Sequence, residues 1–174
     1  MTDPTASRTL VLARHAKAEN DAPSDKSREL THRGHGDAAA MGAWLLAAGL
    51  SFDAVLCSTA TRTRQTWSNI DAAGVAAGDV LFDDRVYNAS VGVLLAVISE
   101  LPEDVASVLV IGHASTIPEV ADLISDPDTS QPAALQALRA AFPSGCIAVL
   151  QLHASWSELG ADRARLTEVA TPRS

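Results

Sequence analysis

The sequence predicts an α/β fold, a three-layer α/β/α sandwich around a mostly parallel central sheet. Short apolar runs alternate with segments whose apolar residues recur at helical spacing. The runs are not interrupted by polar residues, which is typical of strands covered on both faces. The length of 174 residues suits one domain. We expect that domain to span residues 9–170, after a flexible N-terminal tail of residues 1–8.

Four apolar runs are the expected strands, and the assignment of a fifth strand is undecided. The four runs are Leu10–Ala13, Ala54–Cys57, Val108–Ile111 and Cys146–Leu152. Near the C-terminus, Leu166 and Val169 fit either an edge strand or a loop, and the sequence does not decide between them.

Five segments between the runs carry helical patterns. In the first, Thr31 is the expected N-cap and Gly49 the expected end. The others cover residues 60–73, 91–101, 117–124 and 133–140.

Composition excludes several classes of function. A net charge of −8 argues against nucleic-acid binding, which needs a basic surface. No apolar run reaches the length of a membrane span, and the first residues lack the apolar region of a signal peptide, so we expect a soluble, cytoplasmic protein. Cys57 and Cys146 lie in apolar runs and are expected to be buried thiols. His32 and His35 have the spacing of a metal pair, but no further ligand joins them, so we expect neither metal nor cofactor.

Three of the expected strands end in residues that can bind phosphate. Arg14 and His15 follow the first run, Ser58 and Arg62 the second, and His113 the third. Ligands of open α/β sheets bind beyond the carboxyl ends of the strands. If these three strands are parallel, the groups therefore face one crevice.

Each of four residues has a property that suits phosphoryl transfer. Arg14 presents a fork of donors that matches phosphate oxygens. A neutral imidazole nitrogen of His15 can attack phosphorus. Arg62 adds positive charge near a helix start, and His113 can donate a hydrogen bond to the transferring group. Any one of them alone is commonly structural, but four at strand ends favour a phosphate site.

The same residues carry a resemblance to a known family. Leu10–Ala16 resembles the strand followed by Arg-His-Gly of the histidine phosphatase superfamily. Ser58–Thr66 resembles its second motif and Ile111–His113 its third. Asp25–Gly34 and Val86–Ala89 are similar to segments of the small SixA-like branch, the phosphohistidine phosphatases.

This resemblance implies a phosphoglycerate mutase-like fold and a phosphatase that works through a phosphohistidine on His15. It implies that Arg14, Arg62 and His113 bind the phosphoryl group, with Arg28 as a supporting residue whose alternative is a surface ion pair with Asp25 or Glu29. The implied substrate is a protein that carries phosphohistidine, and the product is inorganic phosphate.

Two residues after His15 depart from the family's pattern. Ala16 replaces the usual glycine, and we expect the turn to keep a backbone conformation that alanine allows. Lys17 replaces a residue that is often acidic. The sequence leaves open whether Lys17 joins the phosphate pocket or is a solvated charge at its rim.

No residue stands out as the general acid that the larger branches use. Asp83 and Asp84 precede Val86, whereas the usual acid follows it, where Asn88 stands. Asp84 remains one candidate, and Glu19 in the first loop is another.

The missing acid bears on the substrate. An alkoxide leaving group needs a proton, and general acid catalysis contributes about 10²–10⁴ in rate. A phosphorylated imidazole has a weaker bond and can already carry its proton. The sequence therefore favours phosphohistidine as substrate. A small-molecule phosphomonoesterase and a non-catalytic phosphate-binding module remain as alternatives.

Overall fold

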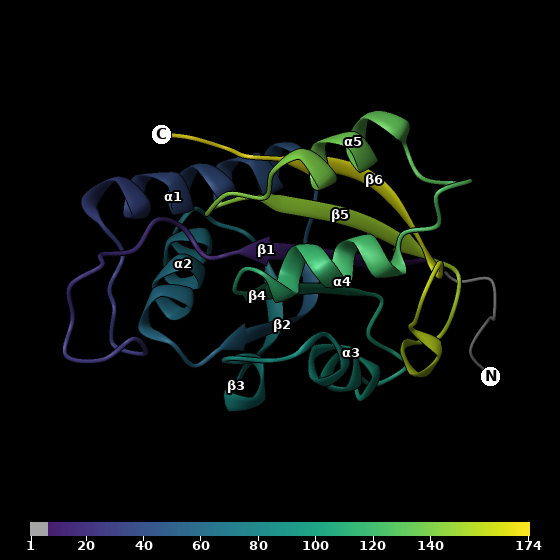
Figure 1. Ribbon diagram of the computed structural model, residues 1–174, viewed down its shortest axis with the longest axis horizontal. Coiled ribbons are helices and arrows are strands. Elements are labelled where there is room, and N and C mark those ends of the chain that lie inside the picture. The colour runs from purple at the N-terminus through teal and green to yellow at the C-terminus, as the bar shows by residue number, and fades with distance from the viewer. Residues whose placement is uncertain (1–6) are drawn as a thin grey trace.

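A six-stranded sheet forms the middle layer of the computed structural model, which describes residues 7–174 (Figure 1). Its strands are β1 (Arg8–Arg14), β2 (Phe52–Ser58), β3 (Ala77–Asp83), β4 (Ser107–Gly112), β5 (Ile147–Leu152) and β6 (Ala164–Ala170). They lie in the order β3-β2-β4-β1-β5-β6. The first four in this order are mutually parallel, whereas β5 is antiparallel to both β1 and β6.

Helices cover both faces of this sheet. The helices are α1 (His32–Ala47), α2 (Thr61–Ala72), α3 (Val91–Ser99), α4 (Thr116–Ile124) and α5 (Pro132–Ala140), with short 3₁₀ turns η1 (Asp84–Val86) and η2 (Trp156–Glu158). One core lies under α1 and α2, and the other under α3, α4 and α5 (Figure 1). The predicted three-layer, mostly parallel sandwich is confirmed.

Strand β1 explains why the apolar runs are unbroken. Leu10 and Leu12 pack into one core, while Val11 and Ala13 pack into the other, and all four are fully buried. Successive strand residues point to opposite faces, so a strand covered twice needs apolar side chains at every position.

The ends of α1 follow the sequence prediction. The hydroxyl of Thr31 accepts a hydrogen bond from Gly34 N at 2.9 Å, as an N-cap does. Gly49 follows the C-cap with φ of +71°, a conformation that glycine adopts without strain.

The sheet differs from the sequence prediction at both edges. Strand β3 was not predicted, because it is an edge strand whose large apolar residues Leu81 and Phe82 are exposed. At the other edge, Leu166 and Val169 lie in β6, so the edge strand is the correct one of the two alternatives for this segment. Strand β5 is antiparallel although its residues read like a parallel strand, since an apolar run reports burial on two faces and not direction.

Residues 1–6 of the expected N-terminal tail lie outside the described residues. Arg8 is not part of a tail but the first residue of β1, and its guanidinium binds the carboxylate of Glu103 at 2.8 Å. Cys57 and Cys146 are buried free thiols, as predicted. Among residues 7–174, no helix has the length and apolar character needed to cross a membrane.

Candidate active site

The carboxyl ends of β1, β2 and β4 open into one pocket of about 480 Å³. The pocket is lined by Arg14, His15, Asp25, Arg28, Arg62, Tyr87, Asn88, His113 and Ala114. The parallel register places Arg14 beside Gly112, so the two histidines that follow these strands become neighbours. The structure thus brings together the four predicted site residues and Arg28.

His15 is the buried nucleophile candidate, with 8% of its surface exposed. Its Nδ1 lies 2.7 Å from the carbonyl oxygen of Ala16, which can only accept, so the proton resides on Nδ1. The lone pair is therefore on Nε2. Burial lowers the pKa of His15 to about 3, and the nearby charges of Arg62 and Arg14 act in the same direction. The ring is neutral at physiological pH.

Arg62, the second residue of α2, connects three parts of the pocket. Its Nε donates to Nε2 of His15 at 3.2 Å, and its Nη2 donates to Nδ1 of His113 at 3.2 Å. The same guanidinium binds the backbone oxygen and the carboxylate of Asp25, at 2.7 and 3.2 Å. Arg62 is 5% exposed, so its charge acts at close range inside the pocket.

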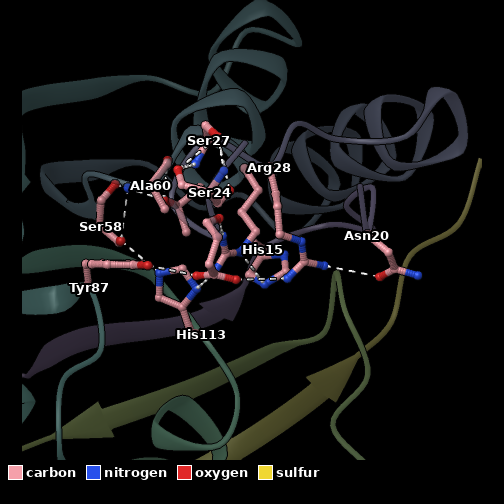
Figure 2. A network of polar contacts seen from close by, with 12 residues as sticks. His15, Asn20, Ser24, Ser27, Arg28, Ser58, Ala60, Tyr87 and His113 are labelled. Atoms are coloured by element: carbon pink, nitrogen blue, oxygen red, sulfur yellow. Dashed lines mark hydrogen bonds and ion pairs between the residues drawn. The ribbon is translucent and has the colours of Figure 1, made fainter. Parts of the chain in front are cut away.

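The tautomer of His113 follows from its two partners. Arg62 can only donate, so Nδ1 of His113 accepts and the proton is on Nε2. That Nε2 donates to the hydroxyl of the fully buried Ser58 at 2.8 Å, as Figure 2 shows. Burial, with the charge of Arg62, lowers the pKa of His113 to about 4.

Arg14 offers a donor that has no acceptor within the described part of the chain. Its Nη1 donates to the carbonyl oxygen of Phe142 at 3.1 Å, while its Nε is buried and makes no hydrogen bond. An unpaired buried donor is costly, and an anion in the pocket could satisfy it.

The backbone around His15 is held from two sides. Gly145 N donates to the carbonyl oxygens of Arg14 and His15, at 3.2 and 2.9 Å. Ala16 N donates to the hydroxyl of Thr66 at 3.0 Å. Ala16 has no positive φ, which confirms that the turn tolerates alanine in place of glycine.

The sequence leaves undecided whether Lys17 and Arg28 belong to the phosphate pocket. The side chain of Lys17 is exposed and does not line the pocket. Arg28 does line it, and it also makes the ion pair with Asp25 that was its alternative, at 3.2 Å. Its Nε donates to the backbone oxygen of Glu19 at 2.6 Å, so Arg28 shapes the loop as well as the pocket wall.

The two candidate acids lie outside the pocket lining. Glu19 and Asp84 are exposed. The carboxylate of Asp84 binds Lys26 Nζ and the hydroxyl of Thr59, both at 2.5 Å, and these bonds lower its pKa. The structure does not bring either carboxylate to the phosphate-binding groups.

Asp25 is a pocket residue that sequence reasoning missed, and Tyr87, which binds it, is another. Oδ2 of Asp25 accepts from the hydroxyl of Tyr87 at 2.8 Å and from Arg62. The hydrogen bond from Tyr87, with those from Arg28 and Arg62, lowers the pKa of Asp25 to about 2. In the sequence, Asp25 stands out only as the first residue of the SixA-like segment Asp25–Gly34. Its spacing to Arg28 is the one sign that these two side chains form an ion pair.

The chain is similar to known proteins in both sequence and fold. Residues 10–94 match the model of the histidine phosphatase superfamily (branch 1). The phosphohistidine phosphatase SixA of Escherichia coli is 32% identical over 119 residues, which cover 67% of this chain and 72% of that protein. A candidate SixA from Nakamurella multipartitia has a TM-score of 0.85 and 39% identity, covering 98% of this chain and 99% of that one. The protein histidine phosphatase SixA complexed with tungstate has a TM-score of 0.77 and 25% identity, over 94% and 97% of the two chains.

Proposed function

The chain belongs to the histidine phosphatase superfamily, and on that premise we propose that it removes phosphate from phosphohistidine in a protein, through a phosphorylated His15. The observation that carries the proposal is the state of His15. A neutral ring presents an unprotonated Nε2 to a pocket lined by Arg14, Arg62 and His113.

In the first step, Nε2 of His15 attacks phosphorus. The bond between phosphorus and the substrate nitrogen breaks, and its electron pair stays on that nitrogen. Arg62 exchanges its bond to Nε2 for a bond to a phosphoryl oxygen, while Arg14 offers its unpaired Nε. The bond from Nδ1 to Ala16 holds the proton on a ring that becomes positive.

His113 completes the oxygen-binding set. The negative phosphoryl group raises the pKa of this histidine, so that Nδ1 can gain a proton and donate, while Nε2 keeps its bond to Ser58. In the second step, water attacks phosphorus and inorganic phosphate leaves. The electron pair of the broken bond returns to Nε2 of His15, and both protons of the water stay with the phosphate, which leaves as dihydrogen phosphate.

The carboxylate of the pocket supports phosphohistidine as the substrate. Among the described residues that line the pocket, Asp25 alone carries a carboxyl group, and its pKa of about 2 keeps it ionised. It has no proton to give to an alkoxide, whose departure would lose the factor of about 10²–10⁴ that a general acid supplies. A protonated phosphoimidazole needs no such proton.

The named relatives support the same substrate class. SixA of Escherichia coli is a phosphohistidine phosphatase by name, and the tungstate in a solved structure of SixA is an oxyanion with the shape of phosphate. We also propose that the partner is a phosphoprotein of the cytoplasm.

A comparison of leaving groups tests the proposal. We expect kcat/KM for a phosphohistidine peptide to exceed that for glycerol phosphate by about 10² or more, in line with the missing general acid. The variant His15→Asn should turn over neither. Faster hydrolysis of glycerol phosphate would instead identify a small-molecule phosphomonoesterase, and phosphate binding without turnover of either substrate would identify a binding module.

A further inference from the structure

The pocket has a buried end and an open end. His15 lies at the buried end with 8% of its surface exposed, whereas the side chain of Asp25 is 53% exposed. In an in-line transfer the leaving group departs opposite the nucleophile. The departing part of the substrate therefore passes the open end, where Asp25 lies with Arg28 and Tyr87 bound to it.

Asp25 has room for one more hydrogen bond. An ionised carboxylate offers about four acceptor positions. Three are used, by Tyr87 and Arg62 on Oδ2 and by Arg28 on Oδ1. The three donors fix the orientation of the carboxylate at the open end of the pocket, so a fourth donor would meet a group that is already in place.

The charge of Asp25 distinguishes between leaving groups. A carboxylate at this position attracts an N–H donor or a cation and repels an anion. A phosphohistidine ring with the phosphoryl group on one nitrogen can carry a proton on the other. The leaving group of an aryl phosphate, a phenolate, has no such donor and carries a negative charge once the bond to phosphorus is broken.

We propose that Asp25 is a specificity-determining residue, which accepts a hydrogen bond from the far N–H of the departing histidine ring and so selects phosphohistidine over aryl phosphate esters. The inference rests on the proposed function, whose substrate class it explains. When the bond between phosphorus and nitrogen breaks, the electron pair stays on that nitrogen. The ring then leaves as neutral imidazole and keeps the proton on its far nitrogen.

The groups that face Asp25 let it act as a hydrogen-bond acceptor over a wide pH range. Arg62 faces it from α2, Arg28 from the loop after β1 and Tyr87 from the turn after η1, with His113 across the pocket. Two permanent cations keep the carboxylate ionised, so the group that titrates near neutral pH is the substrate ring. Asp25 would favour the protonated form of that ring and extend activity to higher pH.

The variant Asp25→Asn tests this role with two substrates, a phosphohistidine peptide and p-nitrophenyl phosphate. We expect the ratio of their kcat/KM values to fall by about tenfold or more, because the loss of a charged acceptor weakens binding of the departing ring. The alkaline limb of the pH profile should move to lower pH for the peptide and stay in place for the aryl phosphate. Asp84→Asn is the matched control, a carboxylate outside the pocket lining, and should keep the ratio of the unmodified enzyme.

An equal loss on both substrates, up to complete inactivity, would overturn the inference, because Asp25 would then serve only to position Arg62. An unchanged ratio would overturn it as well. Neither result touches the proposed function, which fails separately if the unmodified enzyme does not turn over the phosphohistidine peptide.

Discussion

Arg62 donates its Nε–H to Nε2 of His15 across 3.2 Å, so the free enzyme holds its nucleophilic nitrogen against a guanidinium. This contact disfavours a proton on Nε2, because a second positive charge would lie beside the first. It also places the guanidinium where the phosphoryl oxygens must arrive. One residue thereby keeps His15 reactive and prepares the anion site.

Replacing Arg62 by lysine should lower kcat/KM by about 10²–10³, the usual loss for one transition-state donor. Lysine keeps the charge but cannot bind His15, His113 and Asp25 at once, since it lacks the planar fork. The control is Arg64→Lys on the same helix, where the exposed guanidinium stacks on Phe82 at 4.9 Å. Steady-state kinetics of both variants check the prediction, and equal activities would refute it.

Stability should decrease in mild acid because of the two pocket histidines. Their pKa values of about 3 for His15 and about 4 for His113 lie below the unfolded value of roughly 6.5. Between these limits the unfolded chain binds more protons than the folded one. The free energy of unfolding therefore falls as the pH drops, by up to about 1.4 kcal/mol per pH unit for each histidine.

Urea unfolding at pH values from about 6.5 down to about 4.5 measures this slope, a window that lies above the unfolded pKa of aspartate. The variant His15→Asn carries no titrating ring and should show a shallower decrease. The same slope in both proteins would contradict the assigned neutral state of His15.

Gly34 allows α1 to approach the chain just after the nucleophile. A Cβ at this position would lie only 2.0 Å from the carbonyl oxygen of Lys17. We expect Gly34→Ala to lower the free energy of unfolding by about 3 kcal/mol and to reduce activity, because the segment after His15 must shift. Gly92→Ala in α3 is the control, since a Cβ there meets no atom within 4 Å and should stabilise the helix by about 0.5–1 kcal/mol. Comparable stability losses in the two variants would refute the steric argument.

The strands that are buried on both faces could be predicted from the sequence, whereas the exposed edge strand β3 could not. Leu10 to Ala13 reads as a strand because both cores need apolar residues there. Strand β3 has no such pattern, since it forms an edge and leaves Leu81 and Phe82 exposed. The direction of β5 was also not predictable, because hydrophobicity does not depend on strand direction.

The site was predictable where its residues follow buried strands. Arg14, His15 and His113 are placed by β1 and β4, whose parallel direction, but not their pairing, the alternation of elements predicts. Asp25 lies in a polar loop, and its partners Arg62 and Tyr87 are 37 and 62 residues away. Nothing in the local sequence indicates these contacts, which depend on how the loop folds back over α2.

The central claim is that His15 carries the phosphoryl group. Rapid quenching of the enzyme during turnover of a ³²P-labelled phosphohistidine peptide, followed by mass spectrometry, tests it most directly. The account predicts a base-stable, acid-labile label on His15 that forms and decays at rates consistent with turnover, and its absence in His15→Asn. Turnover with no label on His15, or an active His15→Asn variant, would contradict it.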